Sequence, residues 1–172
     1  KNIVKLIEQE KAAAYEGEPA RIIAKMNALT DTEIIKEFYE ASQAGVQIDL
    51  IVRGTCCLKP GIPNVSENIR VVSVVGRFLE HSRVYFFQNA THQIYCSSAD
   101  LMERNLSNRI EVCFPILKKK HANRIIEEME IYLESPTQTW DLDSEGVYSE
   151  RISKEEELLD VQNQLLKRFT QT

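Results

Sequence analysis

The fold of this chain is decided by residues 78–112, which read FLEHSRVYFFQNATHQIYCSSADLMERNLSNRIEV. Two apolar runs, at 84–87 and 93–96, flank a polar loop at 89–91. Runs of aromatic and β-branched residues on either side of a short polar loop predict a β-hairpin. We therefore expect a pair of antiparallel strands in the middle of the sequence.

Polar and charged side chains gather at the adjoining ends of that hairpin. Residues 81–83 read HSR before the first strand, and residues 97–100 read SSAD after the second. Arginine forks match phosphate oxygens, and an imidazole can donate to such oxygens or exchange a proton. The pattern predicts an oxyanion site, although His81 could instead cap a strand and the arginines could lie on a solvated face. The candidate contacts here are His81, Arg83, Ser98 and Arg109.

The residues before the hairpin predict a βαβ unit. Residues 20–26 form an apolar run, a helix over 30–44 is capped by Thr30 or Asp31, and residues 46–52 form a second apolar run. Such a unit has parallel strands and a right-handed connection. Ligands of these sheets bind at the carboxyl ends of the strands, where Lys25, Asn27 and Arg53 lie. Arg53 therefore joins the candidate contacts.

The remaining patterns complete an α/β prediction, a mixed β-sheet flanked by helices on both faces. Helices are expected at 2–15 and 118–134, and strands at 69–75 and 110–117. Residues 140–150 read as a polar excursion before a last helix capped by Ser153. We expect one domain over residues 1–172, with a core at 18–135 and a C-terminal helical extension at 136–172. The chain opens on Lys1 rather than Met, so we expect it to be a piece of a longer protein.

Composition and charge narrow the functional classes. The chain has 172 residues and a net charge of −5, and no apolar run approaches the roughly 18 residues of a membrane-spanning helix. Residues 53–112 carry seven basic groups against five acidic ones, whereas residues 1–52 carry six against nine. This distribution favours a confined anion site over a nucleic-acid surface. The four cysteines do not have the spacing of metal ligands. We therefore expect Cys56, Cys57, Cys96 and Cys113 to be buried, reduced thiols in a cytoplasmic protein.

The order of histidine, cation, strand and hydroxyl-rich segment resembles the phospholipase D superfamily. In that pattern a His-x-Lys pair is followed by an aspartate and, one strand later, by Gly-Ser-x-Asn. A histidine of this kind attacks phosphorus while a cation and amide groups hold the oxygens. The chain departs from the pattern at Arg83, Gln88, Ser97 and Asp100. The superfamily pairs two such halves around one site, and only one half is found here.

A narrower resemblance rests on KMNALTD, ASQAGVQIDLIVRGTCCL, NIRVVSVVGRFLEHSRVYFF and SSADLMERNLSNRIEV. These segments, within residues 18–117, resemble the carboxy-terminal end of bacterial polyphosphate kinase. The resemblance implies reversible transfer of the terminal phosphate of ATP to polyphosphate through a phosphohistidine. It also implies that Arg53 and His81 contact the nucleotide. The phosphohistidine and the Mg²⁺ ligands are then expected in a preceding domain that this chain lacks.

Two functional interpretations follow, beside a purely structural or interaction domain. The favoured one is the ATP-phosphate half of a polyphosphate kinase site. Its partners would be ATP or ADP, polyphosphate and the preceding domains, in a parent that is a homo-oligomer. The isolated chain is then expected to be inactive. The alternative is a phospholipase D-like phosphodiesterase that completes its site as a homodimer.

Overall fold

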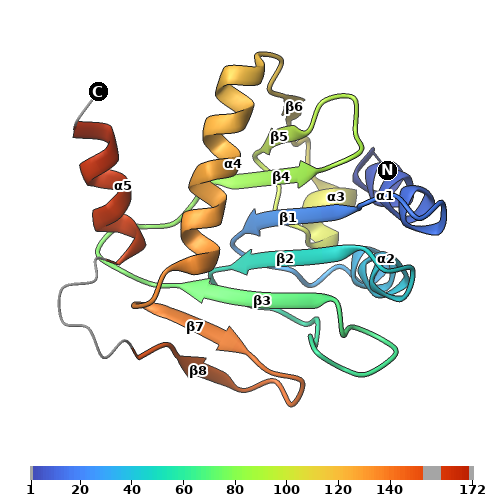
Figure 1. Ribbon diagram of the computed structural model, residues 1–172, viewed down its shortest axis with the longest axis horizontal. Helices are drawn as coiled ribbons and strands as arrows, with labels where there is room; N and C mark the ends of the chain where they lie inside the picture. The colour runs from blue at the N-terminus through green and yellow to red at the C-terminus, as the bar shows by residue number, and fades with distance from the viewer. Residues whose placement is uncertain (1, 153–159, 171–172) are drawn as a thin grey trace.

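The centre of the computed structural model is one eight-stranded mixed sheet with the order β6-β5-β4-β1-β2-β3-β7-β8 (Figure 1). The structure describes residues 2–152 and 160–170. The α/β class and the mixed sheet predicted from the sequence are confirmed. The strands are β1 (Arg21–Met26), β2 (Gln47–Val52), β3 (Ile69–Val74), β4 (Arg83–Phe87), β5 (Ile94–Ser97), β6 (Cys113–Pro115), β7 (Thr139–Leu142) and β8 (Tyr148–Glu150).

Helices cover both faces of this sheet. Alternate strand residues point to opposite faces, so Ile22 shares one core with α1 and α2, and Ile23 shares the other with α4. Figure 1 shows α4 lying across the second face, with α5 beside it. The helices are α1 (Asn2–Tyr15), α2 (Thr32–Gln43), α3 (Glu103–Asn108), α4 (Lys119–Glu134) and α5 (Val161–Thr170).

The predicted βαβ unit is present. Strands β1 and β2 are parallel, with Arg21 opposite Gln47 and Met26 opposite Val52. Helix α2 connects them, and the Asp31 side chain accepts a hydrogen bond from the backbone N–H of Ile34. That bond satisfies a donor that the first helical turn leaves without a partner. Strand β3 pairs in parallel with β2.

The predicted central hairpin is present as well, and its pairing places the site. Strands β4 and β5 are antiparallel, with Arg83 opposite Ser97. Strand β4 is also antiparallel to β1, with Lys25 opposite Val84. The start of β4 and the end of β5 therefore lie at the same sheet edge as the carboxyl ends of β1, β2 and β3.

The prediction for residues 136–150 is wrong. Residues 139–150 contain β7 and β8, an antiparallel hairpin that joins the sheet through β3. The polar side chains of these short strands read as a loop because β8 is exposed along its whole length. The predicted helix start at Ser153 lies outside the described residues. The strand predicted at 110–117 is shorter, covering Cys113–Pro115.

The prediction of buried cysteines is also wrong. Cys57 and Cys113 are exposed, and Cys56 and Cys96 are half-buried. All four are free thiols. Burial raises the pKa of Cys56 to about 11, so this thiol stays protonated at neutral pH.

Candidate functional site

Some of the polar residues singled out from the sequence, among them Asn27, Arg53 and Arg83, meet where β1, β2 and β3 end and β4 begins. A chain of hydrogen bonds connects two of the arginines. The Arg53 Nε donates to Asn27 Oδ1 at 2.9 Å, and the Asn27 backbone N–H donates to Asp100 Oδ1 at 2.7 Å. Arg83 donates to both oxygens of Asp100, at 3.2 and 2.9 Å. Arg53 and Arg83 therefore flank one buried carboxylate.

Asp100 is the fixed point of this cluster. Its Oδ1 also accepts from the backbone N–H of Ala28 at 3.3 Å. Burial opposes its ionisation, but the Arg83 guanidinium and the Asn27 donors hold the pKa of Asp100 below its ordinary value. A carboxylate with this many donors stays ionised and keeps Arg83 in place.

Arg53 and Arg83 differ in how many of their guanidinium nitrogens remain free to bind a ligand. All three nitrogens of Arg83 are engaged, since its Nη1 donates to the backbone carbonyl of His81 at 2.9 Å. Arg53 donates through Nε alone, and its terminal nitrogens have no hydrogen-bond or ion-pair partner among the described residues. The guanidinium of Arg53 therefore retains donors for a ligand.

A second ion pair lies beside this cluster. The Lys25 side chain, only 5% exposed, places Nζ 3.0 Å from Glu80 Oε2 and donates to Ser82 Oγ at 2.8 Å. Burial lowers the pKa of Lys25; Glu80 opposes the shift, while the charges of Arg53 and Arg83 add to it. Three cations are thus held within one small region, with Glu80 and Asp100 as their nearest carboxylates.

His81 lies between these two ion pairs in the sequence, on the segment that leads into β4. Its side chain is exposed, and no hydrogen bond involves its imidazole in the described part of the chain. The backbone on either side is fixed, by Glu80 on one side and by Arg83 on the other. The backbone of His81 is therefore held in place, whereas its imidazole ring has no hydrogen-bond partner among the described residues.

Ser98 and Arg109 fit the predicted site less well. Ser98 directly follows β5, but its hydroxyl donates to Glu111 and accepts from the backbone N–H of Val112 at 3.0 Å. These bonds tie the start of β6 to the end of β5. Arg109 is exposed after α3 and makes no hydrogen bond or ion pair with the described residues. Nothing in the described structure links Arg109 to the cluster.

A cavity of about 290 Å³ opens beside Arg53. It is lined by Arg53, by Val74 at the end of β3 and by the segment 75–79, which includes Arg77. Arg53, whose terminal nitrogens have no partner among the described residues, therefore lines a space in which a phosphate group has room.

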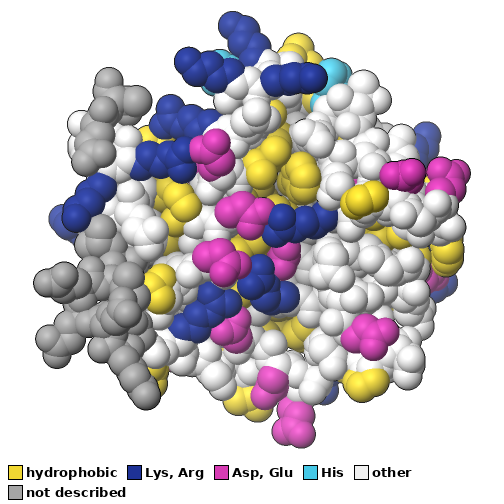
Figure 2. Space-filling view, viewed as in Figure 1, with side chains coloured by type: hydrophobic (Ala, Val, Ile, Leu, Met, Phe, Trp, Pro, Cys, Tyr) yellow, Lys and Arg dark blue, Asp and Glu magenta, His cyan; other side chains and the backbone are white. Residues whose placement is uncertain are grey.

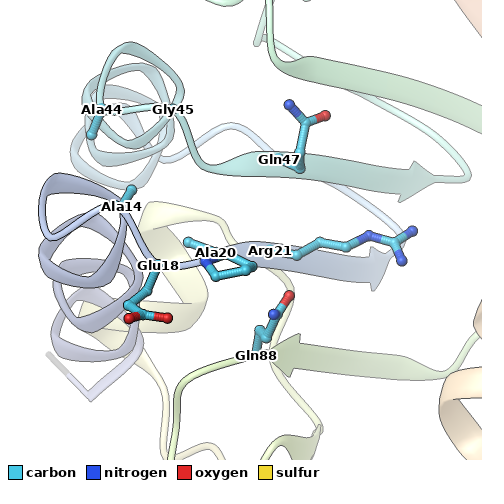
Figure 3. Close-up of a pocket in the computed structure, with 10 residues that line it drawn as sticks. Ala14, Glu18, Ala20, Arg21, Ala44, Gly45, Gln47 and Gln88 are labelled. Carbon is cyan, nitrogen blue, oxygen red and sulfur yellow. The ribbon is translucent and has the colours of Figure 1, made fainter.

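Arg21 and Arg70, which lie outside the candidate site, are paired with carboxylates. On the face shown in Figure 2, acidic and basic side chains alternate along the centre. Arg21 binds both Asp49 and Glu130, and Arg70 binds Asp49. The hollow in Figure 3, about 340 Å³, lies at the opposite sheet edge, and its Arg21 side chain extends away from Ala14 and Ala44. Neither region offers an open cation to an anion.

Sequence reasoning missed Glu80, although Glu80 adjoins His81 and pairs with Lys25. It also missed two residues that hold Glu80, namely Tyr132, whose hydroxyl donates to Glu80 Oε2 at 2.8 Å, and Gln162, whose Nε2 donates to Glu80 Oε1 at 2.8 Å. The visible signal was Lys25 in an otherwise apolar strand, because a buried lysine requires a carboxylate partner. Among the described residues, no group of three or more His, Cys, Asp or Glu side chains could hold a metal ion. No metal-dependent step is assigned to the described residues.

Residues 1–162 match the family model described as polyphosphate kinase C-terminal domain 2. The chain belongs to this family. It is 55% identical over 149 residues to a polyphosphate kinase of Pseudomonas aeruginosa, covering 86% of this chain and 22% of that protein. It is 56% identical over 147 residues to that of Bacillus cereus, covering 85% and 21%. The chain thus spans about a fifth of the length of these curated relatives.

Solved structures agree with this assignment. The polyphosphate kinase of Porphyromonas gingivalis matches with a TM-score of 0.93 and 38% identity, over 99% of this chain and 26% of that one. The phospholipase D family member Nuc from Salmonella typhimurium matches with a TM-score of 0.57 and 16% identity, over 82% and 90%. The second match shows the fold alone, so the predicted phospholipase D-like architecture is confirmed. No helix in the described residues is long and apolar enough to cross a membrane.

Proposed function

We propose that this chain supplies the ATP-phosphate-binding half of a polyphosphate kinase site. The whole enzyme would move the terminal phosphate of ATP reversibly to polyphosphate, through a phosphohistidine in a preceding domain. Mg²⁺, when bound by that domain, would neutralise charge on the phosphates. The parent would be a homo-oligomer working in the cytoplasm.

The observation that carries this proposal is the unpaired end of Arg53. A guanidinium with free terminal nitrogens beside a cavity can bind phosphate oxygens in a bidentate manner. Its neighbour Asn27 fixes Nε, so the fork is oriented before a ligand arrives. The similarity of the chain to polyphosphate kinases supports ATP as the source of that phosphate.

His81 is assigned a different part. Its ring is exposed, and an imidazole can donate a hydrogen bond to a phosphate oxygen or exchange a proton with it. We assign it to contact the transferred phosphate and to donate or accept a proton, without forming the covalent intermediate. Arg83, Ser98 and Arg109 remain candidate phosphate contacts of lower rank, since Arg83 and Ser98 already have partners.

The test uses the full-length enzyme and radiolabelled ATP. Replacing His81 by Ala should slow transfer by about 10²–10⁴-fold, the usual loss for a general acid–base. Arg53→Ala should mainly weaken ATP binding, by about 1.5–3 kcal/mol for a charge-assisted contact. The matched control is Arg124→Ala, which removes an exposed arginine paired with Glu128 on α4. The assignment fails if label attaches to His81 and survives loss of every histidine in the preceding domain.

A second candidate function rests on the shared fold with Nuc. A homodimer of this chain could bring two copies of His81 together and cleave a phosphodiester. Incubating the chain alone with a chromogenic phosphodiester would reveal that activity. Turnover abolished by His81→Ala would favour the phosphodiesterase over the kinase half-site.

A further inference from the structure

The segment that carries His81 has few anchors of its own. Residues 75–82 connect β3 to β4 without regular structure, and only Gly76 and Glu80 among them are half-buried rather than exposed. An exposed connection of this kind samples many conformations unless side chains from elsewhere hold it. The position of the imidazole therefore depends on what holds this segment.

The main anchor comes from α5, far away in the sequence. The buried side-chain amide of Gln162 donates to the Phe78 carbonyl at 2.9 Å and accepts from the Phe78 backbone N–H at 2.8 Å. The same Nε2 donates to Glu80 Oε1 at 2.8 Å. One side chain thus binds both backbone polar groups of Phe78 and the carboxylate next to His81.

Room for this amide depends on Gly76. A Cβ added at Gly76 would lie 2.6 Å from Gln162 Oε1 and 2.8 Å from Gln138 Oε1. Real side chains do not approach so closely, so any larger residue would push the Gln162 amide away from Phe78. The Gln162 amide can therefore occupy its position only because residue 76 is a glycine.

Glu80 connects the side chain of Gln162 to the candidate site. Besides Gln162, it accepts from Tyr132 of α4 at 2.8 Å and pairs with Lys25 of β1 at 3.0 Å. Its side chain is 11% exposed. Three elements thus converge on one carboxylate whose residue is bonded directly to His81.

Attachment of α5 does not require the amide. Val161 and Leu165 of α5 share a small apolar core with Val74, and Ile131 and Tyr132 of α4 pack against it. An apolar side chain at position 162 could extend that core, because burying an amide gains nothing unless its hydrogen bonds are made. The hydrogen bonds of Gln162 go instead to the segment that carries His81.

We propose that Gln162 is a positioning residue, which fixes the His81 imidazole for phosphate transfer through Phe78 and Glu80. The inference rests on the proposed function of His81. Gln162 touches no reacting atom; its contribution is the geometry of the 75–82 segment. Displacing a reacting group by about 1 Å can cost about 100-fold in rate.

The experiment uses the full-length enzyme. Gln162→Met keeps the length of the side chain and removes all three hydrogen bonds, and Gly76→Ala displaces the amide while leaving α5 unchanged. Each should lower kcat by about 10- to 100-fold. The KM for ATP should change less than kcat does, because Arg53 keeps its hydrogen bond to Asn27 even though residues 75–79 also line the cavity beside it. If Gln162→Met fails to fold, Gly76→Ala carries the same expectation.

A double-mutant cycle separates positioning from general structural damage. In the His81→Ala background, Gln162→Met should have little further effect on kcat, because the group it positions is gone. The matched control is Thr139→Val, which removes a buried side-chain hydrogen bond to the Thr137 carbonyl; it should leave kcat unchanged.

Two results would overturn the inference. One is an equal loss in kcat from Gln162→Met with and without His81, and the other is no loss at all. If His81→Ala itself leaves kcat unchanged, the proposed function fails first, and the inference fails with it.

Discussion

At the scale of single residues, Asp100 accepts hydrogen bonds from more donor groups than any other side chain described in the site. It sits where a phospholipase D-like half-site has an asparagine, and its carboxylate accepts hydrogen bonds from Arg83, Asn27 and Ala28. Judged from the sequence alone, Asp100 departs from the phospholipase D pattern. The structure explains the acidic side chain by its partner Arg83, which stands where the motif has a lysine.

Replacing Asp100 by Asn should destabilise the chain by about 3 kcal/mol, because it leaves a largely buried guanidinium without its counter-ion. Both side chains of this pair are mostly buried, at 13% and 10% exposed. Urea denaturation of this chain measures the free energy of unfolding. Glu128→Gln, which breaks an exposed pair with Arg124 on α4, is the control and should cost less than about 1 kcal/mol. Equal losses from the two variants would contradict the prediction.

The same pair sets an acid limit on stability. The pKa of Asp100 is lower in the folded chain than its unfolded value near 4, so the pair stabilises the fold above about pH 4. That stabilisation is lost as the pH falls through the folded pKa, because the unfolded chain binds the proton first. Urea midpoints between about pH 7 and pH 3 should therefore fall less steeply for Asp100→Asn than for the unaltered chain. If the urea midpoints of the two chains fall in parallel, Asp100 does not cause the loss of stability in acid.

At the scale of elements, the β7–β8 hairpin completes the sheet beside β3. Arg151, just after β8, donates to both oxygens of Asp141 on β7, at 2.6 Å each, and to the Leu133 carbonyl at 2.7 Å. The hairpin is thereby tied to the end of α4. Without it, β3 would become an unprotected edge.

Truncation tests this role directly. A chain of residues 1–135 should self-associate, because the exposed N–H and C=O groups of β3 can pair with another molecule. A chain of residues 1–152 keeps the hairpin and also lacks α5, so it is the matched control. Light scattering after size-exclusion chromatography measures the mass of each. Two monomers with the same urea midpoint would show that the hairpin is dispensable.

At the scale of the whole molecule, we propose that the chain presents one side of a site. Arg53 lines a cavity together with residues 74–79, and the exposed His81 follows that segment shortly afterwards in the chain. The chain also spans about a fifth of its relatives. Phosphoryl transfer requires charge neutralisation and positioning on all sides of the transferred group.

We therefore expect the isolated chain to lack polyphosphate kinase activity. The assay incubates the pure chain with ATP, Mg²⁺ and short-chain polyphosphate, and follows ADP release and chain growth. The full-length enzyme, assayed at the same concentration, is the positive control. ADP release and chain growth at the rate of the full-length enzyme would disprove the half-site.

The sequence by itself determined the local architecture and the family. Spacing of apolar residues and helix caps depends on neighbours within a few positions, so the βαβ unit and the 84–96 hairpin could be predicted from residues 20–96 alone. The candidate site at the carboxyl ends of the parallel strands followed from that order. Arg53 was predicted for this reason, and Arg83 was predicted from its place at the end of the hairpin. In the structure Arg83 binds Asp100 directly, and Arg53 is connected to Asp100 through Asn27.

Tertiary structure alone decided which polar groups are free and which are paired. The partners Lys25 and Glu80 are 55 positions apart, and Gln162 reaches Glu80 across 82 positions. Residues 139–142 form β7 because β3 offers an unpaired edge, and the exposed residues 148–150 form β8 because they pair with β7. Long-range pairs such as these depend on how the whole chain packs, and no local pattern in the sequence encodes that packing.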